Sequence, residues 1–159
     1  MLYVTPRHAV FIDPLAQADD AAFWAWADER CRDRQVAVLE TIHFHRRSRD
    51  AFVERYSAST EPPSTVDAMP FALGDETMYW LMEHRALVPG DLLVADDEGE
   101  LSLCPESWFG HLSTKPSADA VRAALAPLLE LDVDLVLTSH GRPVRESGSA
   151  ALARALAPA

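Results

Sequence analysis

The sequence predicts a layered α/β fold in which all 159 residues form a single domain. Short apolar runs rich in Val, Ile and Leu recur along the chain and have the length of buried strands. Several of them are separated by longer stretches with the apolar period of a helix. Strands that alternate with helices favour helices packed outside sheets, and a chain of this length can bury a sizeable core.

The first half of the chain shows this alternation most clearly. Residues 9–12 (AVFI) predict a strand that ends at the turn signal Asp13-Pro14. A helix is expected to open at Asp19 and Asp20, where acidic side chains suit the helix dipole, and a second short helix over residues 49–58. Between the helices, an apolar strand from Val36 is expected to lead to a pair of histidines.

The second half begins with a loop rich in Ser, Thr, Glu and Pro over residues 59–70, with a short strand at its end. A β-hairpin is expected over residues 77–88, followed by short strands over residues 92–95 and 101–104. An irregular segment follows over residues 106–116. A helix over residues 117–131 with Ser117 as its N-cap, a strand over residues 134–139 and a closing helix over residues 149–156 complete the expected elements.

Composition excludes several classes of partner. A formal charge of −11 argues against binding to nucleic acid or an anionic membrane, because both need a basic surface. No apolar run is long enough to span a membrane, and the N-terminus lacks the layout of a signal peptide. Cys31 and Cys104 are far apart and suit reduced thiols. We therefore expect a cytoplasmic protein that acts on a small molecule.

His43 and His45 stand two residues apart at the end of the strand that starts at Val36. Side chains alternate along a strand, so both imidazoles are expected on one face, with Phe44 on the other. Two imidazoles at a strand end could begin a metal site, since imidazole binds zinc and related ions. The alternative is that they only form hydrogen bonds at the strand end.

Two further strand ends carry side chains that bind metals. Asp91 follows Pro89-Gly90, and His140 precedes Gly141 at the end of an apolar strand. Ligand sites of α/β proteins lie at such strand ends. Imidazole and carboxylate are zinc ligands, and a water bound to such an ion becomes a nucleophile, so the pattern indicates metal-assisted hydrolysis. Alternatively, Asp91 caps its turn and His140 only shapes one.

These motifs resemble those of the metallo-β-lactamase fold superfamily. The run LETIHFHRRS is similar to its histidine motif, LVPGDL to its Gly-Asp element, VLTSHGRP to its C-terminal His-Gly-x-Pro element, and AVFIDP to its early strand that ends in Asp-Pro. The resemblance implies an αβ/βα sandwich of mixed sheets with outer helices. It also implies that His43, His45, Asp91 and His140 are metal ligands.

The sequence departs from the family pattern in ways that limit the metal site. Arg47 and Ser48 replace an aspartate and a histidine of the family motif, and no ligand stands at residues 71–73, where the family has another histidine. A guanidinium would repel a nearby second ion. One ion at most is therefore expected, whether zinc, iron or manganese, or none. Arg47 could replace the second ion as an electrophile.

The family's usual first strands are expected to be lacking, because Met1 stands only a few residues before the strand over residues 9–12. An uncovered sheet edge would favour association into a homo-oligomer.

By resemblance, the chain would be a hydrolase of a small ester, thioester or lactone-type substrate, with Asp91 and Arg47 as catalytic residues. The alternative is a non-catalytic binding or dimerising module that keeps the fold without a metal.

Overall fold

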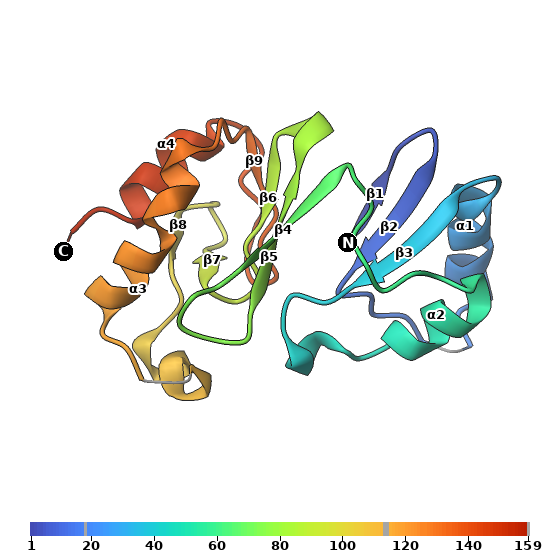
Figure 1. Ribbon diagram of the computed structural model, residues 1–159, viewed down its shortest axis with the longest axis horizontal. Coiled ribbons are helices and arrows are strands. Elements are labelled where there is room, and N and C mark those ends of the chain that lie inside the picture. Colours follow the sequence, from blue (N-terminus) through green and yellow to red (C-terminus); the bar gives the residue numbers. More distant parts are fainter. Residues whose placement is uncertain (18, 113–114, 159) are drawn as a thin grey trace. The chain divides into compact units, whose positions relative to one another are not determined.

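The structure is a computed structural model that describes residues 1–17, 19–112 and 115–158. The chain divides into two compact units, Met1–Ser64 (unit 1) and Thr65–Ala159 (unit 2). Each contains a β-sheet and two α-helices (Figure 1). The predicted mixed α/β architecture is confirmed, and the assignment of one domain stays a prediction.

Unit 1 is a three-stranded sheet with two helices, in the strand order β1-β2-β3. Its elements are β1 (Leu2–Val4), β2 (His8–Ile12), α1 (Ala21–Cys31), β3 (Gln35–Leu39) and α2 (Arg49–Tyr56). Strands β2 and β3 are parallel and joined through α1, as parallel strands require. The side chain of Asp20 caps α1 by accepting a hydrogen bond of 2.8 Å from the Phe23 amide. The predicted strand and both predicted helices are therefore confirmed.

One short strand, β1, precedes β2 within residues 1–17 and pairs with it in the antiparallel sense. The core of the unit forms where α1 and α2 pack on this sheet. Its buried apolar members are Ala9, Phe11, Ala27, Cys31, Val38 and Phe52.

The prediction of a strand from Val36 through His43 and His45 is confirmed in its first half and wrong in its second. Strand β3 ends at Leu39, and a 3-10 helix covers His43–His45. The amide of His45 bonds the carbonyl of Ile42 at 2.8 Å, as a tight turn requires. Because such a helix has three residues per turn, side chains two positions apart differ by about 240° rather than sharing a face.

Unit 2 contains a four-stranded sheet in the order β4-β5-β6-β9 and a two-stranded ribbon, β7-β8. The strands are β4 (Val66–Pro70), β5 (Thr77–Leu81), β6 (Ala86–Val88), β7 (Leu93–Ala95), β8 (Leu101–Leu103) and β9 (Leu135–Val136), and the helices are α3 (Ala118–Leu125) and α4 (Gly148–Ala155). Strands β5 and β6 form the expected hairpin. The Ser117 side chain caps α3 as predicted.

Two elements of unit 2 are shorter than expected. The α-helix predicted over residues 117–131 ends at Leu125 and continues as a 3-10 helix over Ala126–Glu130, because Pro127 cannot donate the amide hydrogen bond. Of the strand predicted over residues 134–139, only Leu135–Val136 forms a strand paired with its neighbour in the sheet. Its remaining residues lead irregularly to His140.

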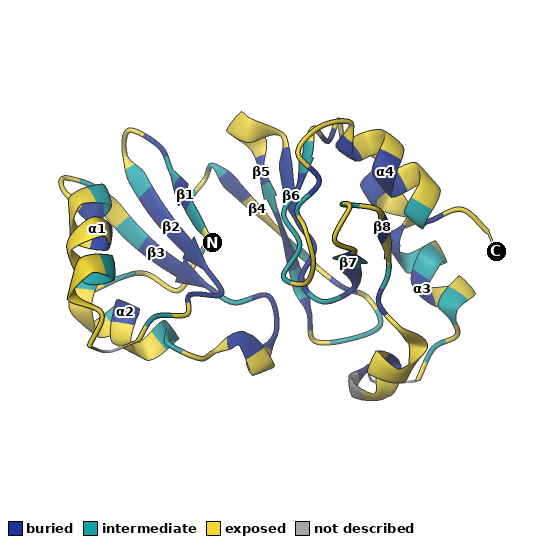
Figure 2. Ribbon diagram, turned by 180° about the vertical axis from the view of Figure 1, so that it is seen from behind, coloured by how far each residue is buried: buried dark blue, intermediate teal, exposed yellow. Residues whose placement is uncertain are grey.

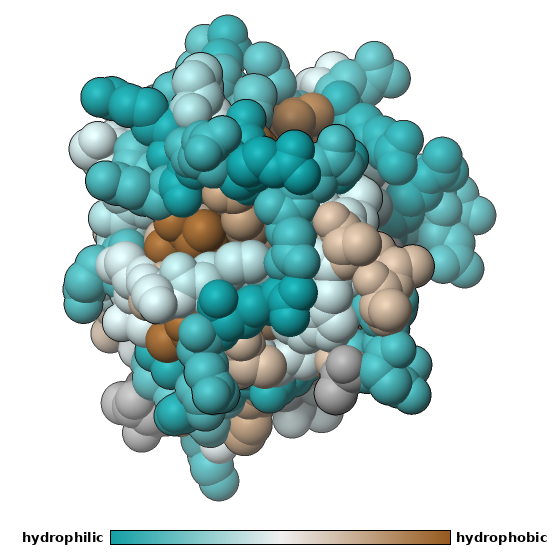
Figure 3. All heavy atoms as spheres, turned by 90° about the vertical axis from the view of Figure 1, so that its right-hand side faces the viewer, coloured by the Kyte–Doolittle hydropathy of each residue, from teal (hydrophilic) through white to brown (hydrophobic). Residues whose placement is uncertain are grey.

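Figure 2 shows β2, β3, β5 and β6 largely buried, β4 largely exposed and the helices exposed along much of their length. The face of unit 1 in Figure 3 is largely hydrophilic, with separate hydrophobic patches. Leu15 and Trp26 are among the exposed apolar side chains of unit 1. The self-association expected from an uncovered sheet edge stays a prediction. Within the described residues, no helix combines the length and apolarity needed to cross a membrane. Cys31 and Cys104 are both buried free thiols.

Candidate metal centre

In unit 1, His45 is buried in a hydrogen-bonded group with Asp13 and Thr41. Its Nδ1 lies 2.9 Å from Asp13 Oδ2 and 3.0 Å from Thr41 Oγ1. The Thr41 amide and hydroxyl donate to the two oxygens of the same carboxylate at 2.8 and 2.6 Å. Asp13 directly follows β2 in a left-handed conformation (φ 49°), which aspartate tolerates better than most residues. The ends of two adjacent strands therefore fix the imidazole.

The hydrogen bond to Asp13 determines which nitrogen of His45 can bind a ligand. An ionised carboxylate only accepts hydrogen bonds, so Nδ1 carries the proton that it donates to Asp13. The lone pair of the neutral ring is then on Nε2. Metal-binding histidines are commonly oriented in this way by a carboxylate on the other ring nitrogen.

The other predicted residues of this segment are arranged differently. His43 is exposed, and its ring centroid lies 3.8 Å from that of Phe44. Arg47 is exposed, has a φ of 26°, and borders a hollow lined also by Trp24 and Glu54. The Ser48 hydroxyl accepts a hydrogen bond from the Ala16 amide at 3.0 Å and donates to the Ala16 carbonyl at 3.1 Å. Ser48 therefore serves to hold the chain after β2.

In unit 2, Asp91 follows Gly90, whose φ of 67° makes the turn between β6 and β7. Its backbone amide donates a hydrogen bond of 3.1 Å to Glu76 Oε2. Glu76 is itself 1% exposed and stands just before β5. This buried carboxylate holds the backbone of Asp91, and the carboxyl group of Asp91 is half-buried.

His140 lies beside Asp91, with His140 Nε2 3.4 Å from Asp91 Oδ1. The ring of Trp108 packs edge-on against the imidazole at a centroid distance of 5.1 Å. The backbone of the segment is fixed by β7, because the Ala95 amide donates to the His140 carbonyl at 3.1 Å.

Gly141 allows this close approach to β7. Its φ is 82°, and a Cβ at this position would lie 1.5 Å from the Ala95 carbonyl oxygen. A side chain at position 141 would therefore displace the segment that carries His140.

Cys104 is close enough to Glu76 and Asp91 for their negative charges to affect its thiol. Burial, together with the negative charges of Glu76 and Asp91, raises the pKa of the Cys104 thiol to about 12. The thiol is therefore protonated at neutral pH. Thiolates, not thiols, bind metals and act as nucleophiles, so these neighbours disfavour either role for Cys104.

Within unit 2 the structure brings together two predicted residues, Asp91 and His140, whereas within unit 1 His43 is exposed and His45 is buried. Sequence reasoning missed the roles of Asp13, Thr41 and Glu76. A signal existed for Asp13, since it ends an apolar strand in the quoted Asp-Pro motif. None existed for Glu76, whose partner is a backbone amide distant in sequence.

Comparisons with known proteins identify the fold. No protein-family model matches the sequence, and no curated protein matches it. Solved structures do match. ETHE1 from Myxococcus xanthus is 20% identical with a TM-score of 0.62, over 98% of this chain and 76% of that one. VMB-1 is 13% identical with a TM-score of 0.61, over 98% and 82% of the two chains. A metallo-β-lactamase from Hirschia baltica is 13% identical with a TM-score of 0.54, over 99% and 85%.

Proposed function

We propose that this chain, which has the metallo-β-lactamase fold, is a metal-dependent hydrolase with a single metal site. The proposed ligands are His45, Asp91 and His140, each of which can offer one ligand atom. The observation that carries the proposal is the spacing of the two ligands in unit 2. At 3.4 Å, His140 Nε2 and Asp91 Oδ1 are further apart than in a strong charge-assisted hydrogen bond. Two atoms each about 2.1 Å from one tetrahedral ion lie about 3.4 Å apart.

The contacts of His45 support its role as the third ligand. Its Nδ1 is engaged by Asp13, which leaves Nε2 as the atom that binds the ion. Three protein ligands and one open position are the arrangement of catalytic zinc sites. Zinc is the proposed ion on this ground, and iron or manganese would accept the same nitrogen and oxygen ligands.

The residues beside His45 disfavour a second ion. Arg47 brings a fixed positive charge, and the hydroxyl of Ser48 is engaged with the backbone of Ala16. The exposed His43 packs against Phe44. A ligand role for His43 stays a prediction.

When bound, the ion would supply Lewis-acid activation of a substrate carbonyl and of a water molecule. The residues of the chain would then orient the reacting water and stabilise the charge that develops on the substrate. Asp91, held through its backbone by Glu76, would place the reacting water by accepting its hydrogen bond. Arg47 would stabilise the negative charge that develops on the carbonyl oxygen.

The proposed substrate is a small ester, thioester or lactone, in which a carbonyl carbon is the electrophile. A chain with a net charge of −11 repels polyanionic substrates at long range, so a neutral or weakly charged molecule suits it better than a nucleic acid.

Metal content tests the site. Purified without chelator, the wild-type chain is expected to carry about one zinc, iron or manganese per chain. Single substitutions His45→Ala and His140→Ala should each remove it, whereas His84→Ala, at an exposed position in the β5–β6 turn, should not. Because His140 is exposed, its loss should leave the fold intact. His43→Ala separates a three-ligand from a four-ligand set.

Turnover tests the activity. We expect the wild-type chain to hydrolyse an aryl ester, a thioester or a γ-lactone, and the His140→Ala variant to lack this activity. Chelation of the wild-type chain should abolish the activity, and added metal should restore it. Arg47→Gln should lower kcat while metal content stays unchanged. If the chain binds no metal and shows no thermal shift with zinc, a non-catalytic binding module is the correct reading. Bound metal without turnover on any of the three substrates would contradict the hydrolase.

A further inference from the structure

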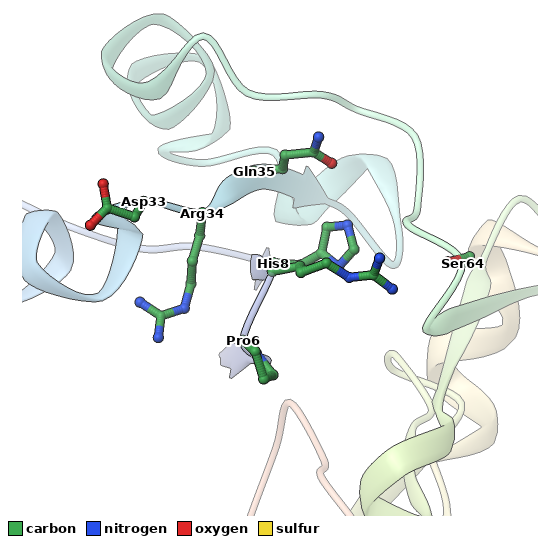
Figure 4. A pocket seen from close by; sticks show the side chains of 7 residues that line it. Pro6, His8, Asp33, Arg34, Gln35 and Ser64 are labelled. Carbon is green, nitrogen blue, oxygen red and sulfur yellow. The ribbon is translucent and has the colours of Figure 1, made fainter.

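A second hollow lies in unit 1, at the end of the sheet where β2 and β3 begin. Its volume is about 460 Å³, within the range of small-molecule pockets. Apart from Pro6, its lining is polar or charged: Arg7, His8, Asp33, Arg34, Gln35 and Ser64 (Figure 4). His8 and Asp13 stand at opposite ends of β2, about 17 Å apart along a strand of this length. The hollow is therefore separate from the His45 half of the metal site.

The lining concentrates positive charge in a strongly acidic chain. Two guanidinium groups and one imidazole face a single carboxylate, that of Asp33. Arg34 is held rigidly, because its Nε donates to the Thr5 carbonyl at 2.8 Å and its Nη1 to the Arg30 carbonyl at 3.1 Å. In the described part of the chain, the Nη2 of Arg34 has no such bond and can donate to a ligand.

The loop before β2 is fixed in one conformation by Thr5, which is buried. Its hydroxyl accepts hydrogen bonds from the amides of His8 at 2.9 Å and Arg7 at 3.3 Å, and its own amide bonds the His8 carbonyl at 2.9 Å. The side chains of Arg7 and His8 therefore leave a preformed turn, which lowers the entropic cost of binding.

His8 and Gln35 are register partners on adjacent parallel strands, so their side chains lie on the same face of the sheet. Figure 4 shows them next to each other at the hollow. The Nδ1 atom of His8 is buried and has no hydrogen-bond partner among the described residues. A buried polar atom without a partner is costly, and the described part of the protein does not itself satisfy this imidazole nitrogen.

We propose that this hollow binds the phosphate group of a small organic phosphate. Arg7 and Arg34 would form charge-assisted hydrogen bonds to the phosphate oxygens, and the imidazole of His8 would line the same side of the phosphate. Gln35 and Ser64 would contact the organic part. The hollow is larger than a bare phosphate ion needs, which favours a phosphate monoester over the free ion. The proposal does not depend on the metal site.

Titration of the 159-residue chain followed by ¹H–¹⁵N NMR tests the proposal, with inorganic phosphate and glycerol 3-phosphate as probes. Saturable shifts are expected at the amides of His8, Gln35 and Ser64, with the monoester binding more tightly. Arg7→Gln should weaken binding about tenfold, the effect of one lost charge-assisted hydrogen bond. Arg7 is exposed and its side chain bonds nothing in the described residues, so this variant should fold.

Arg32→Gln is the matched control, because it removes the same charge from a nearby exposed residue that does not line the hollow. Its binding should stay within about twofold of wild type. Equal losses in both variants would mean general charge attraction and would overturn the proposal. The proposal would also be overturned if neither probe saturates the shifts at a concentration of about 10 mM, because binding would then be too weak to be specific. Shifts confined to the His45 or His140 region would assign the phosphate to the metal site and also reject the hollow.

Discussion

The proposed metal ligands of unit 1 and those of unit 2 are held in opposite ways. His45 is buried, and its side chain is fixed by Asp13 and Thr41 inside unit 1. His140 has a side chain that is 44% exposed and is placed mainly through its backbone, which is bonded to β7. In unit 1 the hydrogen bonds that orient His45 also hold the fold together. In unit 2, His140 can be substituted without loss of the core, because its side chain is exposed. Stability and metal affinity should therefore respond differently to substitutions in the two units.

The largest contrast is expected between Asp13→Ala and Asp91→Asn. Asp13→Ala leaves the buried Thr41 amide, Thr41 hydroxyl and His45 ring without their acceptor, and should lower the free energy of unfolding by about 3 kcal/mol. Asp91→Asn should remove the metal but change the stability of the metal-free chain by less than about 1 kcal/mol. Urea denaturation of metal-free samples measures both. Equal losses of stability in the two variants would contradict the conclusion that the ligands of unit 1 and unit 2 are held in different ways.

Glu76→Gln should have an intermediate effect, confined to unit 2. An amide oxygen can still accept the hydrogen bond from the Asp91 amide, but more weakly than a carboxylate. We expect zinc affinity to fall by about tenfold, as for other residues that orient metal ligands. Competition with a chelating dye measures it. Glu83→Gln, on the exposed turn after β5, is the control and should leave affinity unchanged.

Trp108→Leu should give the smallest effect. The edge-on contact with His140 contributes about 1 kcal/mol at most, so zinc affinity should drop by a few-fold with stability nearly unchanged. The same dye competition applies. A loss as large as that of Glu76→Gln would show that the ring, rather than the backbone of β7, positions His140.

The sequence predicted more of the scaffold than of the site. Strand β2, helix α1 with its Asp20 cap and the β5–β6 hairpin follow from local patterns, because propensity and apolar period act over a few residues. Helix α3 is shorter than its predicted range of residues 117–131, and Pro127 inside that range is a local signal that the prediction did not use.

The failures concern long-range contacts. Alternation predicted that His43 and His45 share a face, but the chain turns tightly after β3, where Thr41 bonds Asp13 across 28 residues. Glu76 was missed for the same reason, because its bond to the Asp91 amide depends on the fold. The pairing of Asp91 with His140 was anticipated because each follows an apolar strand, and the likeness of two short motifs to a known family supported it.

Gly141 has a consequence for recognising related sequences. Since any Cβ there would collide with the carbonyl of Ala95, the glycine is required by the path of the backbone whether or not a reaction takes place. The adjoining histidine carries no such steric demand. In distant homologues, glycine at this point would therefore indicate the architecture alone, whereas a histidine before it would bear on the proposed metal site, together with the positions of His45 and Asp91.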